Sequence, residues 1–305
     1  MTSGPEENGT PTNRRRLPPW LKVPMPTGTN YRRVQRLLRE AALHTVCEGA
    51  HCPNVGDCWE RRTATFMILG DVCTRNCRYC AVTHGRPAPV DAEEPLRVAL
   101  AVEQLALRYA VVTSVTRDDL PDGGAAVFAD TIRAIRQRNP ECAVEVLVPD
   151  FGGDDAALQT VLDARPQVLN HNIEVARRLF PQVRPQGDYL RSLYLLRRAR
   201  EMVPEVTTKS GLMVGLGETW EEVLDTMRDL RGVGCNILTI GQYLQPSRLH
   251  YPVARYYTPS EFVRLRQEGE AMGFAHVASG PLVRSSYHAD EHRTGAIDDA
   301  PTRTV

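Results

Sequence analysis

The sequence lacks the features that mark membrane-spanning and secreted proteins. No run approaches the roughly 18 consecutive apolar residues of a transmembrane helix. No apolar stretch follows the basic residues 14–16, as a secretory signal would require, and Glu6 and Glu7 are unusual in an Arg-rich transit peptide. We therefore expect a cytoplasmic protein with no membrane partner.

The sequence also has no net charge at neutral pH when histidine is counted as neutral. The 305-residue chain holds 37 Lys and Arg against 37 Asp and Glu. This balance gives no overall field that would attract nucleic acid, so we expect no nucleic-acid partner. The length suffices for one large barrel domain or for two ordinary domains.

Cysteine is scarce but concentrated. Six of the eight cysteines form two triplets: the first is Cys47, Cys52 and Cys58, and the second is Cys73, Cys77 and Cys80. The second triplet has the spacing Cys-x3-Cys-x2-Cys, and three thiolates at this spacing can hold three irons of a [4Fe–4S] cluster. The fourth iron then has no protein ligand, which indicates a catalytic cluster.

Disulfides and structural zinc fit these cysteines less well than a cluster does. A disulfide framework is typical of short secreted chains. A structural zinc site needs four ligands, commonly in paired knuckles, and neither triplet has a second knuckle. His44, His51 or His84 could supply a fourth ligand, so zinc remains an alternative. The remaining cysteines, Cys142 and Cys235, lie in apolar segments and are predicted to be buried.

Composition and periodicity divide the chain into four parts. Residues 1–30 are rich in Pro, Gly, Thr and Asn, which predicts a flexible tail, either disordered or wrapped around the rest. Residues 31–60 combine a predicted helix with the first triplet. Residues 61–280 carry a regular alternation, and 281–305 form a C-terminal segment that is predicted to be mobile after Asp290.

Short apolar runs alternate with helical segments in this third part. The runs, which predict strands, are 65–69, 110–115, 143–148, 168–173, 212–216, 237–240 and 274–278. The predicted helices are 95–107, 125–138, 155–164, 189–202, 221–230 and 259–272. This order predicts right-handed βαβ units and a parallel sheet, with fewer units than the eight of a complete barrel. We expect an α/β fold, a partial (β/α)6-type TIM barrel with an N-terminal cluster-binding extension.

The second triplet directly follows the first predicted strand, after Ile68-Leu69-Gly70. Catalytic groups of such barrels lie at the carboxyl ends of the strands. The position therefore agrees with a catalytic cluster. It also resembles the signature of radical S-adenosylmethionine enzymes, in which the open iron binds the methionine moiety and the cofactor is cleaved to a radical that abstracts hydrogen.

Eight segments carry a more specific resemblance, and all of them occur in order. They are residues 48–59, 67–80, 85–87, 114–125, 170–174, 208–219, 239–246 and 284–287. Together they are similar to the lipoyl synthase family, over about Trp20 to Ala289. The resemblance assigns 61–280 to the radical S-adenosylmethionine barrel and 284–287 to the Arg-Ser-Ser-Tyr motif of that family.

The resemblance implies a reaction, its cofactors and its partners. Lipoyl synthases insert two sulfur atoms at C6 and C8 of an octanoyl chain attached to a lysine of a carrier domain. A saturated chain offers no acidic proton and no leaving group, so the step needs a radical supplied by a cofactor. The implied cofactors are two [4Fe–4S] clusters and S-adenosylmethionine, with the cluster of the first triplet auxiliary and consumed as sulfur donor. The implied partners are octanoylated lipoyl carrier domains (E2 subunits of 2-oxoacid dehydrogenases and the glycine cleavage H protein), an electron donor such as ferredoxin or flavodoxin, and an iron–sulfur assembly or carrier protein.

The resemblance also implies a serine ligand for the auxiliary cluster. The best alignment places Ser286 in that role, with Ser285 as the alternative. An alkoxide is a harder iron ligand than a thiolate, so its departure during sulfur transfer is reasonable. Without the resemblance, both serines would be interpreted as an ordinary turn.

Five further residues are implied to contact S-adenosylmethionine. Gly123 and Gly124 would bring the backbone close to the methionine amino group. Asn172 and Glu174 would contact the ribose hydroxyls, and Arg191 would grip the methionine carboxylate with its two-pronged guanidinium. Taken alone, the glycines fit a plain turn and Arg191 a solvated helix face.

Some residues near the expected site receive no role. Lys209 and Gln242 lie at strand ends and could face the octanoyl-lysine, and His171 is interpreted as a hydrogen-bonded structural residue. Two rival functions are a methylthiotransferase, which usually adds an RNA-binding domain for which this chain has no room, and a zinc-stabilised binding module without catalysis.

Overall fold

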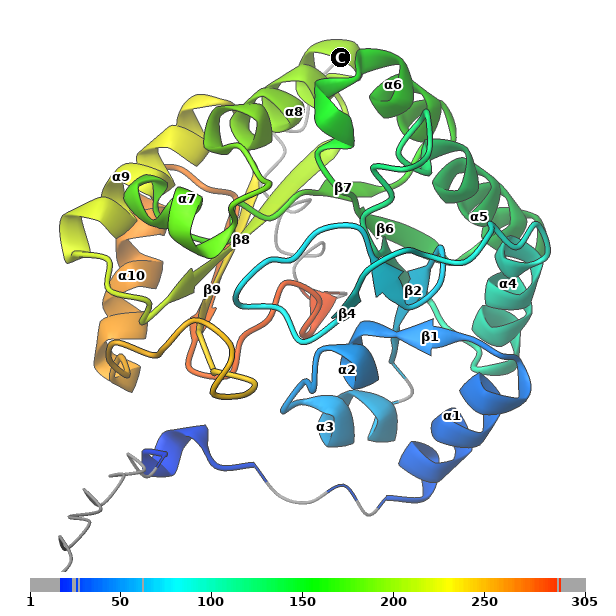
Figure 1. Ribbon diagram of the computed structural model, residues 1–305, viewed down its shortest axis with the longest axis horizontal. Coiled ribbons are helices and arrows are strands. Elements are labelled where there is room, and N and C mark those ends of the chain that lie inside the picture. Colours follow the sequence, from blue (N-terminus) through cyan, green and yellow to red (C-terminus); the bar gives the residue numbers. More distant parts are fainter. Residues whose placement is uncertain (1–16, 24–25, 27, 62, 290, 292–305) are drawn as a thin grey trace, which may run out of the picture.

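Seven parallel strands form the centre of the molecule (Figure 1). The computed structural model describes residues 17–23, 26, 28–61, 63–289 and 291. The strands, in hydrogen-bonded order, are β2 (Thr65–Ile68), β5 (Tyr109–Ser114), β6 (Ala143–Leu147), β7 (Val168–Asn170), β8 (Thr207–Val214), β9 (Ile237–Gln242) and β10 (His276–Gly280). The short strand β1 (His44–Thr45) adds to β2 in antiparallel orientation.

Six helices connect these strands and cover the outside of the sheet (Figure 1). They are α4 (Glu94–Gln104), α5 (Ala125–Arg138), α6 (Asp155–Asp163), α8 (Tyr189–Met202), α9 (Trp220–Gly232) and α10 (Pro259–Ala271). The sheet has β1 at one edge and β10 at the other, so the barrel does not close. The predicted partial (β/α)6 barrel is confirmed. None of the helices within the described ranges is long and apolar enough to cross a membrane.

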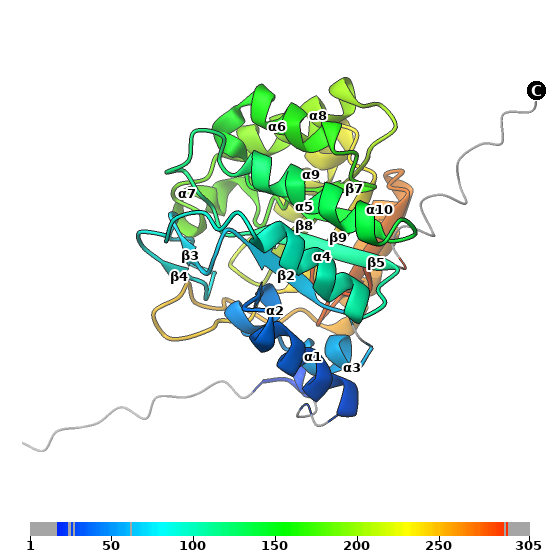
Figure 2. The ribbon, with the colours of Figure 1, turned by 90° about the vertical axis from the view of Figure 1, so that its right-hand side faces the viewer.

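The remaining elements are short helices and strands outside this alternation, together with the longer helix α1. They are η1 (Pro19–Leu21), α1 (Thr29–Glu40), α2 (Val46–Gly49), α3 (Val55–Glu60), β3 (Val72–Cys73), β4 (Thr83–His84), η2 (Phe151–Gly153), η3 (Arg177–Leu179) and α7 (Phe180–Val183). The helices α1, α2 and α3 gather on the side of β2 (Figure 2). Tyr31 of α1 packs on Trp59 of α3, with ring centroids 5.0 Å apart.

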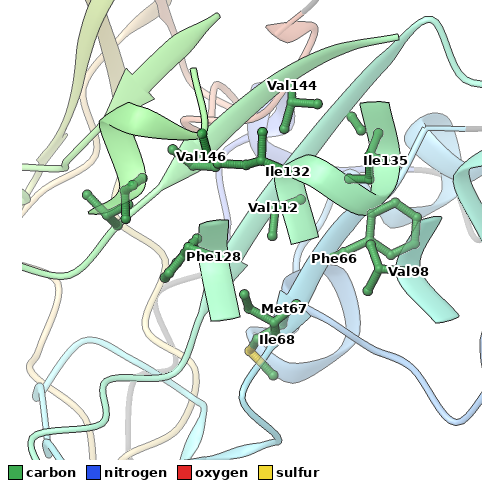
Figure 3. Close-up of a cluster of buried hydrophobic side chains, with 14 of the residues drawn as sticks. Phe66, Met67, Ile68, Val98, Val112, Phe128, Ile132, Ile135, Val144 and Val146 are labelled. Atoms are coloured by element: carbon green, nitrogen blue, oxygen red, sulfur yellow. The ribbon is translucent and has the colours of Figure 1, made fainter. Parts of the chain in front are cut away.

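Side chains on alternate strand positions face opposite sides, as a pleated strand requires. Phe66, Ile68, Val112, Val144 and Val146 point outward and are fully buried against α4 and α5 (Figure 3). Each such side chain stabilises the fold by roughly 1.5–3 kcal/mol. The odd-numbered positions between them therefore face the barrel interior.

Two strands differ from their predicted bounds. Strand β8 begins at Thr207, five residues before the predicted start at Leu212, because its first residues are polar and carry no hydrophobic signal. They are nonetheless buried with hydrogen-bonding partners, such as Asn236 Oδ1 for the N–H of Thr208 at 3.0 Å. Strand β7 ends at Asn170, three residues early, since the chain turns there toward the barrel mouth.

The described residues before α1 contact the barrel, which agrees with the second of the two alternatives for this tail, a segment wrapped around the rest. Pro19–Leu21 form a turn of 3-10 helix, Leu21 is 2% exposed, and Trp20 Nε1 donates to the Tyr257 carbonyl at 3.2 Å. This part of the tail therefore contacts the barrel. Residues 1–16, and the predicted mobile C-terminus beyond Glu291, lie outside the described residues.

Candidate functional site

The second triplet lies on a loop that a small parallel sheet closes. Strands β3 and β4 pair Cys73 with His84, and the loop between them carries Cys77 and Cys80. Gly85 donates its backbone N–H to the Cys73 carbonyl at 2.9 Å. The loop is thus pinned at both ends, at the carboxyl end of β2.

Arg75 ties this loop to two neighbouring strand ends. Its guanidinium donates to both carboxylate oxygens of Asp118 at 2.8 Å, and to those of Asp150 at 2.7 and 3.0 Å. Asp150 is fully buried. Burial alone would raise the pKa of Asp150, but the hydrogen bonds and charge of Arg75 hold it below its usual range. The fork therefore fixes the loop against β5 and β6 with charge-assisted bonds.

The first triplet lies on α2 and α3. Cys47 is in α2, whose first turn is capped by Thr45 Oγ1 accepting the N–H of Glu48 at 3.3 Å, and Cys58 is in α3. All eight cysteines are free. Burial raises the pKa of Cys47 to about 11 and of Cys58 to about 12. Binding of a metal cluster requires the thiolates and would release these protons.

Both triplets line one cavity of about 350 Å³. Within the described residues, no three His, Cys, Asp or Glu side chains converge where a single metal ion could sit. A cubane cluster needs no such convergence, because its irons occupy separate corners. Cys73 Sγ accepts backbone N–H groups from Arg75 at 3.4 Å and Thr116 at 3.3 Å. Each triplet supplies three thiols, the number of protein ligands of a [4Fe–4S] cluster with one open iron, whereas a structural zinc ion takes four ligands.

The two triplets lie at different depths of the barrel. Cys73 meets Thr116, beyond the carboxyl end of β5. The Cys47 thiol instead has a hydrogen bond with the backbone of Thr65, which begins β2 and pairs with Val111 of β5. Val111 lies within β5, three residues before its end at Ser114, and Thr116 lies two residues beyond that end. The first triplet therefore lies near the start of β2 and the second at the barrel mouth.

The C-terminal segment returns to this cavity. Asn54 Nδ2 donates to the Leu282 carbonyl at 2.7 Å, which fixes the segment beside α3. Ser285 and Ser286 both line the cavity. Ser285 Oγ accepts a hydrogen bond from Asn172 Nδ2 at 3.4 Å. The geometry therefore brings both candidate serines to the two triplets.

Asn172 and Glu174 also line the cavity, just beyond β7. Glu174 has φ +70°, a left-handed conformation that is rare outside glycine and typical of functional sites. Backbone hydrogen bonds to β8 hold it there: the Glu174 N–H donates to the Gly211 carbonyl at 2.9 Å. Asn172 Oδ1 is buried and has no hydrogen-bond partner among the described residues, which leaves an acceptor for a ligand hydroxyl.

The other three implied cofactor contacts lie outside the cavity lining. Gly123 and Gly124 have φ +60° and +90°, and a Cβ on Gly124 would come 2.3 Å from Leu69 Cδ1, so the turn requires glycine there. Arg191 is 37% exposed and lies 3.6 Å from the Asp150 carboxylate. As far as the described residues define it, the cavity lining does not include these three residues.

Arg184 is a cavity residue that the sequence analysis missed. It is 8% exposed, stacks on Phe180 at 5.4 Å and donates to the Asn172 carbonyl at 3.1 Å. Burial would lower its pKa, but Tyr79, Glu174 and Cys77 raise it. No carboxylate oxygen of the described residues lies within ion-pair distance of it. Glu174 therefore acts on Arg184 electrostatically without forming an ion pair, and the buried guanidinium at the cavity wall can also bind an anionic ligand group.

His171 lies against the same cavity in a structural setting. Its ring nitrogens contact the Val148 carbonyl at 2.8 Å and Ser192 Oγ at 3.0 Å. Burial lowers its pKa to about 4, so the imidazole is neutral near pH 7. The two partners satisfy both nitrogens, as a packing role requires.

Comparison with known proteins agrees with this geometry. A model of the radical SAM superfamily matches residues 67–230, and a model of the N-terminal domain of lipoyl synthase matches residues 5–52. A lipoyl synthase of Rubrobacter xylanophilus is 60% identical over 96% of this chain and 95% of its own length. A lipoyl synthase of Roseiflexus sp. is 58% identical over 92% of this chain and 94% of its own.

Solved structures resemble the chain in fold. The crystal structure of methylornithine synthase covers 86% of both chains with a TM-score of 0.50 at 12% identity. That of HydG, a maturase of the [FeFe]-hydrogenase, covers 70% of this chain and 55% of its own with a TM-score of 0.52 at 17% identity. At these identities they show a shared barrel only. The two lipoyl synthases, by contrast, are about 60% identical to the chain over nearly its whole length. The chain therefore belongs to the lipoyl synthase family of the radical S-adenosylmethionine superfamily.

Proposed function

We propose that the two triplets hold two [4Fe–4S] clusters that act on one substrate chain between them. The chain is an enzyme of the sulfurtransferase type, which inserts sulfur at C6 and C8 of a protein-bound octanoyl-lysine. The observation that carries the proposal is that both triplets line the same cavity, the first beside the start of β2 and the second beyond the carboxyl end of β5. A substrate in this cavity can meet both.

Each triplet has its own part in this proposal. Cys73, Cys77 and Cys80 hold the cluster at the barrel mouth, and Cys47, Cys52 and Cys58 hold the deeper one with Ser286, or alternatively Ser285, as its fourth ligand. When bound, S-adenosylmethionine and the mouth cluster supply the hydrogen-abstracting radical, and the deeper cluster supplies sulfur. The protein holds the substrate still and excludes water from the cavity.

Two arginines are candidates for the methionine carboxylate of S-adenosylmethionine. Arg191 is the candidate from sequence, and Arg184 is the candidate that lines the cavity beside Asn172 and Glu174. Asn172 and Glu174 would contact the ribose, and the backbone at Gly123 and Gly124 the amino group. Because Arg191 already has Asp150 as its counter-ion, we favour Arg184.

We predict that Arg184→Gln weakens binding of S-adenosylmethionine by roughly 30-fold or more, since losing one side of a buried charge pair costs about 2–5 kcal/mol. Binding to the anaerobic, cluster-loaded protein is measured by equilibrium dialysis. The matched control is Arg191→Gln, which removes the same charge from a side chain that is 37% exposed. This variant is expected to change the affinity for S-adenosylmethionine by less than about threefold. If Arg191→Gln weakened binding more than Arg184→Gln does, Arg191 and not Arg184 would bind the methionine carboxylate.

The partners follow from the family. The enzyme acts on lipoyl carrier proteins. In finer detail, the proposed carriers are the E2 subunits of 2-oxoacid dehydrogenases and the glycine cleavage H protein, with ferredoxin or flavodoxin as electron donor and an iron–sulfur carrier to rebuild the spent cluster. The proposed location is the cytoplasm.

The test is an anaerobic reconstitution with iron and sulfide. We expect about eight irons per chain, and dithiolated product with 5′-deoxyadenosine after addition of dithionite, S-adenosylmethionine and an octanoyl-lysyl peptide. Cofactor cleavage without thiolation would keep a radical enzyme with another substrate. Tightly bound zinc in place of iron, with no cleavage, would favour a binding module.

A further inference from the structure

We propose that the barrel interior beneath the second triplet is the pocket for the acyl chain, and that a buried polar network at its base sets the chain length. The network consists of Tyr109, Glu145, Asn170 and Lys209. It would act as a floor against which the methyl end of the chain rests. This inference rests on the proposed function, because it takes octanoyl-lysine as the substrate.

The walls of this pocket come from the inward-facing positions of the strands. The cavity is lined there by Thr65, Met67, Val111, Thr113, Leu147 and Thr239. Three of these side chains are apolar, and the hydroxyls of Thr113 and Thr239 already donate to the carbonyls of Leu147 and Ser210, which suits a saturated chain. Gly211 adds room: a Cβ at this position would come 2.6 Å from Asn172 Oδ1 and 3.1 Å from Thr239 Oγ1.

The floor is a closed set of hydrogen bonds. Lys209 Nζ donates to the two Glu145 oxygens at 2.9 and 3.1 Å, and both side chains are fully buried. Tyr109 Oη donates to Glu145 at 2.7 Å, and Asn170 Nδ2 donates at 3.1 Å. The Glu145 carboxylate is therefore fully engaged, and an apolar chain cannot displace any of these donors without leaving a buried charge short of a partner.

Tyr109 is the contact between the cavity and this network. Tyr109 is among the residues that line the cavity, whereas Glu145 and Lys209 are fully buried and are not among them. Tyr109 is the first residue of β5, and Val111 lies two residues further along the same inward face. Val111 is the partner of Thr65, beside which Cys47 lies. The base of the pocket at Tyr109 is therefore one inward-facing strand position below the level of Cys47.

This arrangement gives the floor a function in positioning. The carrier domain is too large to enter the cavity, so the amide end of the acyl chain must face the mouth and the methyl end the floor. A chain stopped by Tyr109 presents its last carbons beside Val111, at the depth of the sulfur-donating cluster. The enzyme would thus measure the chain from its methyl end, and both sulfurs enter near that end.

The test compares the affinity of hexanoyl-, octanoyl- and decanoyl-lysyl peptides for the cluster-loaded protein with S-adenosylmethionine but without reductant. For the unmodified chain, we expect decanoyl to bind at least tenfold more weakly than octanoyl, because two methylenes find no pocket. Tyr109→Ala should deepen the pocket and reduce the ratio of octanoyl to decanoyl affinity to about threefold or less. Tyr109→Phe keeps the ring and should retain the ratio.

A second pair of variants guards against loss of folding in Tyr109→Ala. Val111→Leu adds one methylene to the pocket wall and should weaken octanoyl more than hexanoyl, by about fourfold. Val112→Leu adds the same group on the outward face of the strand and should leave the relative affinities of the three acyl peptides unchanged. Equal octanoyl and decanoyl affinities in the unmodified protein, or unchanged ratios in folded Tyr109→Ala and Val111→Leu, would overturn the floor. Those results are distinct from a failure of the proposed function, which would show as no binding of any acyl peptide and no thiolation.

Discussion

Cys52→Ala is expected to preserve cleavage of S-adenosylmethionine and to abolish sulfur insertion, whereas Cys77→Ala is expected to abolish both. The reason is the separation of the triplets, which assigns each cysteine to one cluster at one depth of the barrel. Each variant should lose roughly four of the eight irons. Iron content, 5′-deoxyadenosine and dithiolated peptide are measured on the same anaerobic samples.

The control for this pair is Cys142→Ala. Cys142 is 3% exposed and lies outside the cavity lining of the described residues, so its substitution should leave iron content and product unchanged. Loss of cleavage in Cys52→Ala, with its remaining irons intact, would mean that the two clusters do not act separately. Thiolation by Cys52→Ala would remove the first triplet from the role of sulfur donor.

The ligand residues were predictable because metal-ligand spacing is a local property of the sequence. Three thiols within eight residues, placed after a buried strand, indicate a cluster at a barrel mouth before any contact is known. The depth of the first triplet was not predictable in this way. It depends on the pairing of β1 with β2 and on the contact of Cys47 with Thr65, which are tertiary features.

The charged residues that support the site were missed for a similar reason. Arg75 sits inside the loop of the second triplet, but its partners Asp118 and Asp150 are 43 and 75 residues away. Arg184 follows a short helical turn and precedes a proline, and only the folded barrel shows that it is buried beside Glu174 at the cavity. Sequence position indicates where strands end, whereas charge pairing across strands needs the register.

Lys209 illustrates this limit and carries the second large prediction. The chain contains two lysines, Lys22, which is exposed, and Lys209, which is fully buried beside Glu145. Lys209→Met removes one partner of a buried ion pair and leaves Glu145 charged and uncompensated, which is expected to destabilise the fold by about 3–5 kcal/mol. The measurement is the midpoint of thermal unfolding of the anaerobic, cluster-loaded protein.

Two further variants separate the lost charge pair from simple loss of a lysine. Lys22→Met removes the same group from an exposed position and should change stability by less than about 0.5 kcal/mol. Lys209→Met combined with Glu145→Leu replaces the pair by apolar side chains and should recover most of the stability, because the buried charge is then gone as well. Equal midpoints for Lys209→Met and Lys22→Met would show that the ion pair does not hold the base of the barrel. Failure of the double variant to recover would instead mean that Tyr109 and Asn170, left without their acceptor, contribute as much as the pair itself.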